Sequence, residues 1–515
     1  MALALAAGLA QAASLAWPLS WQTSPLLALG LRSGQPVWWL QLLAMALLAL
    51  LLPTCRNWRQ AAWMGWLFAL AWLGAAVGWT FVALNTYGGL PALLSLLAVL
   101  AFAGFMALFY ATACGAFFAT GLARKRSTSA IFAAFWMLAE LARGTWLSGF
   151  GWGASGYAHV DGPLAGYAPW LGVYGLCALS AWLGMTLVSI WNVPGGRTKL
   201  RSLLSALVVL GLPALVSWVA PQWSQATGQL SVTLLQGNIA QDEKFEAGTG
   251  IPLALQWYRE QLQRSQTSLV VAPETAIPLL PQQLPADYWQ GLQQKFDSGQ
   301  QAALIGIPLG DYQKGYTNSV LGLKPGQTSN WRYDKQHLVP FGEFIPQFFK
   351  WFTALMNIPL GDFNRGAPKQ APFVWQGQKV ATNICYEDLF GEELAVQFAE
   401  PDLAPDIFVN ISNLAWFGNG LAMNQHLQIA RMRALEFERA FILSTNTGVS
   451  AIIDHRARVR SALAPDTRAV LVGQVEGRVG VTPYAWWVAR FGLWPIWLLA
   501  LALVLLATRT RRTGS

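Results

Sequence analysis

Three short segments of the 515-residue chain carry side chains that could perform chemistry, and the first of them delivers a carboxylate. Residues 270–272 read as a hydrophobic strand, and Pro273, Glu274 and Thr275 follow it directly. Layered α/β folds place their sites at the ends of strands, so Glu274 is a candidate acid or base. Taken alone, this segment is explained more simply by a helix N-terminal acid or a salt-bridged surface glutamate.

The second segment, residues 333–343, combines many functional groups with proline and glycine. It reads Tyr-Asp-Lys-Gln-His-Leu-Val-Pro-Phe-Gly-Glu. An unpaired lysine at Lys335 could supply a fixed positive charge to a reaction. A solvated loop is the simpler alternative when this segment, too, is taken alone.

The third segment carries Cys385. A strand over Lys379–Ile384 ends on this residue, and a helix-like run begins at about Asp388. A thiol at a strand end can reach a substrate, and the start of a nearby helix could help to hold it as a thiolate. Cys385 is therefore a candidate nucleophile.

The cysteine pattern leaves the use of Cys385 open. The other three cysteines, Cys55, Cys114 and Cys177, lie in or beside apolar runs and read as small core residues. There is no CxxC and no cysteine cluster, which argues against a metal site or a disulfide framework. In an oxidising compartment, a lone Cys385 is either used in chemistry or buried and inert.

The three segments belong to a globular region, residues 221–483. Strand-like runs alternate there with helix-like segments such as Leu253–Arg264 and Met423–Arg439, a pattern that favours a layered α/β fold. The strand-like runs are Leu230–Leu235, Leu269–Ala272, Ala302–Ile307, Val380–Ile384, Ile407–Ile411, Phe441–Ser444 and Ala469–Val475.

The flanking regions predict a multi-pass α-helical membrane domain. A helix needs about 20 apolar residues to cross a bilayer. About eight apolar runs qualify, near residues 2–19, 36–53, 62–83, 91–120, 129–147, 163–191, 202–219 and 485–507. We expect seven spans within residues 1–220, and an eighth with a short basic tail within residues 484–515. A cleaved signal peptide is the alternative for the first run, but the positively charged n-region of such peptides is missing.

Charge placement predicts the orientation. Only 11% of the residues are charged and 54% are hydrophobic, which excludes a disordered chain and an ordinary cytosolic protein. Basic residues gather after every second span, at Arg56/Arg59, Arg124–Arg126, Arg197–Arg201 and Arg509–Arg512. The positive-inside rule then places both chain ends in the cytoplasm and residues 221–483 outside.

The net charge of +9 lies on the membrane regions, because residues 221–483 carry slightly more acids than bases. It therefore marks topology and does not indicate a nucleic-acid partner. Inside the fifth span, Glu140 and Arg143 are three residues apart, so they share a helix face and could form an ion pair.

The order, spacing and flanks of Glu274, Lys335 and Cys385 resemble the nitrilase superfamily, whose members use a Glu–Lys–Cys triad on an α-β-β-α sandwich. Eight spans around such a domain narrow the resemblance to the bacterial apolipoprotein N-acyltransferases, and it runs nearly end to end. The motifs that carry it are WLSGFGW (146–152), QGNI (236–239), PETAIP (273–278), KQHLVPFGEFIP (335–346), ICYE (384–387), ISN (411–413), AWFG (415–418), QH (425–426), ARMRA (430–434), TNTG (445–448) and TPYA (482–485).

The resemblance implies a role for each site residue. Cys385 would be the nucleophile, Glu274 the general base and Lys335 the cation that stabilises the tetrahedral oxyanion. Supporting roles would fall to Glu343, Tyr386, Glu387 and Phe245. The residue types suit the chemistry, because a thiol with an ordinary pKa near 8.5 needs a base or a nearby positive charge to become a nucleophile.

The resemblance also implies a reaction, its partners and its location. An acyl chain would pass from a membrane phospholipid through a Cys385 thioester to the α-amino group of an N-terminal diacylglyceryl-cysteine on an apolipoprotein. The partners would be the phospholipid donor, the apolipoprotein acceptor and the bilayer, with no cofactor and no nucleic acid. The enzyme would lie in the bacterial inner membrane with an extracytoplasmic, periplasmic catalytic domain.

Three positions depart from the family pattern. Leu414 stands where Asp usually follows the Asn before AWFG, Leu443 replaces a frequent Arg, and Phe245 replaces a common Trp. They concern the substrate loops and leave the triad intact.

Two other functions remain possible on the sequence. A membrane-anchored nitrilase-type amidase would use the same triad, with water as the acyl acceptor. A transporter or structural membrane protein with an inert sandwich would not use Cys385 at all.

Overall fold

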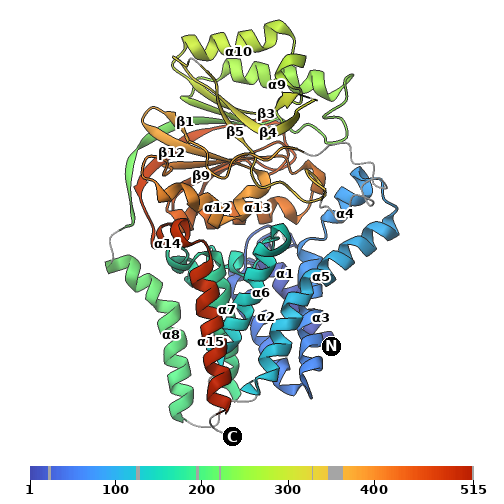
Figure 1. Ribbon diagram of the computed structural model, residues 1–515, viewed down its shortest axis with the longest axis vertical. Helices are drawn as coiled ribbons and strands as arrows, with labels where there is room; N and C mark the ends of the chain where they lie inside the picture. The colour runs from blue at the N-terminus through green and yellow to red at the C-terminus, as the bar shows by residue number, and fades with distance from the viewer. Residues whose placement is uncertain are drawn as a thin grey trace. The chain divides into compact units, whose positions relative to one another are not determined.

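The computed structural model describes residues 1–20, 25–122, 128–192, 196–219, 222–311, 313–327, 329–345 and 363–512. Two compact units make up the chain (Figure 1). The helical unit comprises Met1–Phe81, Ala92–Gln222 and Phe491–Ser515, and the sandwich unit comprises Val82–Pro91 and Trp223–Arg490. The predicted basic cluster Arg124–Arg126 lies outside the described residues.

A helix overlaps each of the predicted apolar runs. These helices are α1 (Ala2–Leu15), α2 (Trp38–Leu51), α3 (Trp58–Ala76), α5 (Ala92–Ala119), α6 (Ser129–Thr145), α7 (Ala168–Asn192), α8 (Gly196–Val219) and α15 (Trp494–Arg512). Among the described residues, three helical segments are long and apolar enough to cross a membrane: Ala92–Ala119, Pro163–Trp191 and Gly196–Val216. The number rises to five if each of two bent helix pairs forms one span.

The two bent pairs differ from the uninterrupted spans that the sequence predicts. The run near 62–83 breaks after α3, and Thr80–Tyr87 continues at an angle of 64°. The run near 485–507 divides into α14 (Pro483–Phe491) and α15, bent by 89°. Gly492 lies at this second break with φ of +55°, a left-handed conformation that favours glycine. Hydrophobicity alone does not report such breaks.

The predicted ion pair inside the helical unit is confirmed. Arg143 donates to Glu140 Oε2 at 2.8 Å, and both side chains are fully buried on α6. The guanidinium also donates to Tyr110 Oη and to the carbonyl oxygens of Phe150 and Trp152, at 2.6–2.8 Å. These bonds satisfy the buried charge, as a low-dielectric interior requires.

The sandwich unit contains two six-stranded sheets. The first has the order β12-β1-β2-β3-β4-β5 and the second the order β11-β10-β9-β8-β7-β6. The first sheet contains β1 (Ser224–Gln236), β2 (Leu269–Ala272), β3 (Ala302–Asp311), β4 (Gly315–Leu323), β5 (Trp331–Asp334) and β12 (Ala469–Gly480). The second contains β6 (Phe373–Trp375), β7 (Gln378–Ile384), β8 (Ile407–Ser412), β9 (Ala440–Thr445), β10 (Ala451–Ile453) and β11 (Val459–Ala462).

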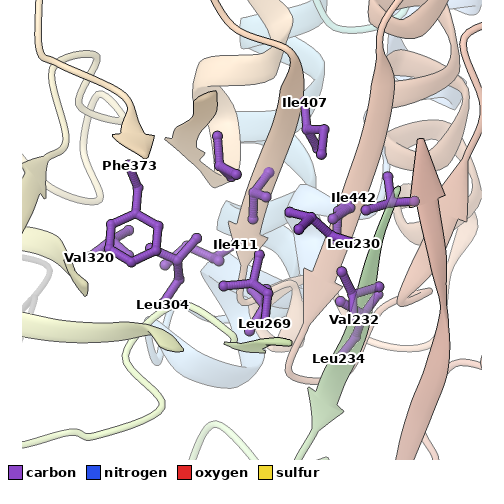
Figure 2. Close-up of a cluster of buried hydrophobic side chains, with 14 of the residues drawn as sticks. Leu230, Val232, Leu234, Leu269, Leu304, Val320, Phe373, Ile407, Ile411 and Ile442 are labelled. Atoms are coloured by element: carbon purple, nitrogen blue, oxygen red, sulfur yellow. The ribbon is translucent and has the colours of Figure 1, made fainter. Parts of the chain in front are cut away.

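Alternating side chains make this unit a four-layer sandwich. On β2, Leu269 and Val271 join the apolar cluster between the two sheets, and Figure 2 shows Leu269 there beside Leu304 and Ile411. Val270 and Ala272 point the other way, toward α9 (Gly250–Arg264) and α10 (Ala286–Ser298). Because strand side chains alternate with period two, one short strand serves both cores. Helix α13 (Leu421–Phe437) covers the second sheet in the same manner.

A short segment from the N-terminal half belongs to the sandwich unit. Residues 82–91 lie between α3 and α5 in the sequence, yet they group with the α/β fold. Tyr87 packs edge-on against Trp416, with ring centroids 5.6 Å apart.

Candidate active site

Strand ends bring the candidate residues together. Glu274 follows β2 and Lys335 follows β5, both in the first sheet, while Cys385 follows β7 in the second. Lys335 Nζ lies 3.4 Å from Glu274 Oε1 and 2.9 Å from Glu343 Oε1. Cys385 lies near enough for these three charges to shift its pKa. The structure thus places the predicted base, cation and nucleophile, together with Glu343, in one site.

Each carboxylate of the site is fully engaged. Glu274 accepts hydrogen bonds from the side-chain amide of Asn318 at 2.6 Å and from the backbone N–H of Asn413 at 2.8 Å, in addition to its contact with Lys335. Asn413 follows β8, so this bond connects the two sheets across the site. Glu343 accepts from the same Asn318 amide at 2.9 Å and from the N–H of Val339 at 2.9 Å.

Lys335 is held as a cation. Burial lowers the pKa of its ammonium group, but the carboxylates Glu343 and Glu274 outweigh burial and raise the pKa above its ordinary value. Its side chain is only 1% exposed, and its ammonium group lies within 3.4 Å of both carboxylates. A permanently charged, immobile ammonium is the group that can stabilise a developing oxyanion.

Cys385 occupies a strained turn. Its φ of +53° is in the left-handed region, where a residue other than glycine costs on the order of 1–3 kcal/mol. Asn410 donates to its carbonyl oxygen at 2.9 Å and helps to fix the turn. Strained backbone conformations of this kind are often found at functional sites.

The surroundings of Cys385 disfavour the thiolate that the start of a nearby helix was expected to favour. Burial raises the pKa of Cys385 well above its ordinary value, Glu274 adds to the rise, and Lys335 opposes it. The helix-like run expected from about Asp388 is present but broken, because a 3-10 turn spans Cys385–Leu389 and the five-residue α12 (Gly391–Ala395) follows it. A reaction at this sulfur would therefore need a base to remove the thiol proton.

Glu387 connects the lysine segment to the cysteine segment. Its carboxylate accepts from the N–H groups of Gln336 and His337 at 2.7 and 3.0 Å, beside Lys335. It also accepts from the N–H of Ile384 at 2.7 Å and from Tyr333 Oη at 2.9 Å. Burial raises the pKa of Glu387 to about 7, against the effect of the backbone donors.

Two family models cover most of the chain. Residues 4–186 match the apolipoprotein N-acyltransferase N-terminal domain, and residues 231–484 match the carbon-nitrogen hydrolases. An apolipoprotein N-acyltransferase of Verminephrobacter eiseniae is 52% identical over 95% of this chain and 92% of its own length. One of Ralstonia nicotianae is 42% identical over 93% of this chain and 90% of its own.

The chain belongs to the apolipoprotein N-acyltransferase family. The predicted membership, the acyltransferase class and the carbon-nitrogen hydrolase fold of the C-terminal half are thereby confirmed. Among solved structures, a carbon-nitrogen hydrolase from Helicobacter pylori G27 aligns with 53% of this chain and 94% of its own, at 16% identity and a TM-score of 0.35.

The remaining predicted residues of this N-acyltransferase site differ in exposure. Tyr386 is buried, with its ring edge-on to Phe390 at 5.2 Å. Phe245 is 42% exposed, so a large apolar ring faces outward there. The departures Leu414 and Leu443 are both buried in the core beneath α13, where an apolar side chain needs no polar partner.

Two residues of the site were not predicted from the sequence. Asn318, on β4, contacts both carboxylates. Lys244 is 1% exposed and donates to the backbone oxygen of Glu274 at 3.1 Å, and burial lowers its pKa to about 8. Asparagine is depleted in strands, so the polar residues around Asn318 were the one feature of the sequence that could have drawn attention to this position. Lys244 sits in a charged turn that offers no such signal.

Proposed function

We propose that this protein transfers an acyl chain from a membrane phospholipid to the N-terminal α-amino group of a diacylglyceryl-modified apolipoprotein, by way of a thioester on Cys385. The observation that carries the proposal is the joint placement of Cys385, Glu274 and Lys335 in a member of this family. A partly buried thiol beside a carboxylate and an ammonium has the parts that two-step acyl transfer needs.

In the first half-reaction, Glu274 takes the thiol proton of Cys385 while the sulfur attacks the ester carbonyl carbon of the phospholipid. The electron pair of the carbonyl bond moves to its oxygen, and Lys335 stabilises that oxyanion. Collapse of the intermediate breaks the carbon–oxygen ester bond. Glu274 returns its proton to the leaving oxygen, lysophospholipid departs, and the acyl group stays on Cys385.

In the second half-reaction, the neutral α-amino group of the acceptor attacks the thioester carbonyl. Glu274 takes a proton from the attacking nitrogen, and Lys335 again stabilises the oxyanion. Collapse breaks the carbon–sulfur bond, and the thiolate of Cys385 regains a proton from Glu274. The products are an N-acylated apolipoprotein and the free enzyme.

The supporting residues have distinct proposed tasks. Glu343 fixes Lys335 through its 2.9 Å contact, and Glu387 fixes the turn that carries Cys385. Tyr386 follows the nucleophile in the chain, and its ring packs against Phe390. The exposed ring of Phe245 offers an apolar surface to a lipid substrate. No cofactor takes part in these steps.

The membrane arrangement is proposed as eight spans, with domain limits at 1–220, 221–483 and 484–515. In this arrangement the catalytic domain is periplasmic at the bacterial inner membrane, and both chain ends are cytoplasmic. The basic clusters after alternate spans support the orientation. Both substrates are lipid-anchored, and a site at the membrane avoids moving acyl chains into water, which costs about 0.8 kcal/mol per CH₂.

The reaction can be tested with purified protein, a phospholipid of defined acyl chain and a diacylglyceryl-cysteine peptide. We expect the acyl chain on the peptide nitrogen and lysophospholipid in equal amount. If free fatty acid were the only acyl product, the hypothesis of a nitrilase-type amidase, with water as the acceptor, would replace that of a transferase.

A further inference from the structure

Two carboxylates share one cation at the candidate site. Glu274 Oε1 and Glu343 Oε1 both contact Lys335 Nζ, at 3.4 and 2.9 Å. Neighbouring carboxylates repel each other, and where nothing compensates the repulsion one of them retains a proton to a higher pH. One ammonium group offsets only part of the charge of two. If Glu274 kept a proton, it could not accept one from Cys385.

The side-chain amide of Asn318 supplies a further donor to each carboxylate. Its Nδ2 lies 2.6 Å from Glu274 Oε1 and 2.9 Å from Glu343 Oε1, the same two oxygens that Lys335 contacts. An amide nitrogen carries two hydrogens, so it can donate one to each carboxylate. Each Oε1 then receives two donors, which favours the ionised form of both groups.

The chemistry of the pair fixes the orientation of the amide. A reversed amide would direct its oxygen at two carboxylate oxygens, all of them acceptors. In the orientation observed, Asn318 Oδ1 is buried and has no partner among the residues the structure describes. An unpaired buried carbonyl is a cost that an apolar residue would avoid. The contribution of this amide to the site is therefore its two N–H groups.

The position of Asn318 is set by its strand. It lies on β4, whose neighbour β5 ends directly before Lys335, and its backbone oxygen accepts from the N–H of Lys335 at 2.8 Å. Asn318 is 3% exposed. The same residue therefore holds the backbone of the cation and the side chains of both carboxylates.

We propose that Asn318 is a positioning residue for acyl transfer, which keeps Glu274 and Glu343 ionised together beside Lys335 and so leaves Glu274 free to act as the base for Cys385. The inference rests on the proposed function. Among the described residues, the titratable groups that interact with Glu274 or with its partners are Lys335, Glu343, Cys385 and Lys244. Glu387 titrates nearby without contact to Asn318, so its effect is common to the wild type and the variants.

The test is the pH dependence of single-turnover acylation of Cys385, measured by intact mass, in the wild type and in Asn318→Leu. Loss of both N–H donors should move the acid side of the profile up by about one to two pH units. At a pH on the acid limb the rate should fall at least tenfold, and at alkaline pH it should recover to near the wild-type value. Thr233→Val, which removes a buried hydroxyl elsewhere in the same sheet, should keep the wild-type profile.

A second variant covers a failure of Asn318→Leu to fold. Asn318→Asp has the same shape and offers at most one donor, so its acid limb should shift in the same direction. A uniform loss of rate with an unmoved midpoint, in a variant with the wild-type melting temperature, would overturn the proposal and leave Asn318 a packing residue. Absence of any acyl-enzyme in the wild type would instead refute the proposed function, so the two failures are distinguishable.

Discussion

At the scale of single residues, the site is a compact arrangement of charge around a thiol that is neutral at rest. The two carboxylates beside Lys335 raise its pKa and favour its charged form, whereas burial and the same carboxylates raise the pKa of Cys385 and disfavour a thiolate. In the proposed mechanism, the reaction therefore begins with proton removal by Glu274. Lys335 contributes when negative charge develops on the substrate oxygen.

Lys335→Met should remove the oxyanion partner and leave two buried carboxylates without their cation. We expect acyl transfer to fall by at least about 10²-fold. The melting temperature should fall as well, because an unpaired buried charge is destabilising. The matched control is Lys369→Met, which breaks the more exposed ion pair with Glu400 and should change neither quantity much. Near-normal transfer by Lys335→Met would remove this lysine from the mechanism.

The raised pKa of Glu387 predicts that the stability of the fold depends on pH. Its pKa is about 7 in the fold against an ordinary value of 4.5, so the folded state binds the proton more tightly than the unfolded state. Its contribution to stability is fully present below about pH 4.5 and is lost as the pH rises through about 7. The side chain of the Glu387→Gln variant cannot titrate, so the melting temperature of this variant should change less with pH between these values. An unchanged slope in thermal unfolding would show that Glu387 ionises freely.

The sequence could locate Glu274, Lys335 and Cys385 because each follows a strand-like or loop signal and because their order matches a family. It could not locate Asn318 or Lys244. Their importance comes from strand neighbours and a folded turn that bring them to Glu274 from 44 and 30 residues away. It could not decide how the ionisation of Cys385 is shifted, because desolvation depends on burial, which only the folded chain defines.

At the scale of elements, two sheets from distant parts of the chain deliver one site. Glu274, Asn318 and Lys335 come from the first sheet, and Cys385 and Asn413 come from the second. The apolar cluster between the sheets (Figure 2) holds the two sheets, and with them these strand ends, together. Packing between the sheets is therefore a condition for the catalytic geometry.

Leu304→Ala tests this dependence. Leu304 is fully buried in the cluster between the sheets, so its truncation should destabilise the sandwich by about 2–5 kcal/mol. Val472→Ala, at a strand residue that is 64% exposed, is the control and should change stability little. Thermal unfolding followed by a probe in the sandwich unit would measure both. Equal melting temperatures for the two variants would contradict the assigned core.

The seven strand-like runs that the sequence predicts are all strands in the structure: β1, β2, β3, β7, β8, β9 and β12. The strands that it missed are β4, β5, β6, β10 and β11. Some of these are only three or four residues long, and β4 carries the polar run around Asn318. Short or polar strands are defined by pairing with neighbours, and this pairing is not visible in local composition.

At the scale of the whole molecule, composition distinguishes two kinds of region within the one chain. The low charge of 11% averages a helical unit rich in apolar residues with a sandwich unit of more ordinary composition. Apolar runs predicted where the helices lie, but not the breaks after Ala76 and at Gly492, because hydropathy carries no information on backbone direction.

The proposed topology makes opposite predictions for two reporter positions. A reporter fused after Arg126 should be active as a cytoplasmic fusion, since this basic loop follows the fourth proposed span. A reporter inserted near Gln300, beyond α10 in the sandwich unit, should be active as a periplasmic fusion. Paired enzymatic reporters specific to each compartment would decide. The reverse pattern would refute the proposed orientation.

The most direct test of the central claim is the intact mass of the full-length protein after incubation with a phospholipid of defined acyl chain and no acceptor. We predict that the wild type gains the mass of one acyl group on Cys385, and that this mass is lost when a diacylglyceryl-cysteine peptide is added. Cys385→Ser should gain none and should transfer nothing. An acyl group elsewhere on the wild type, or acyl transfer by Cys385→Ser, would contradict the account.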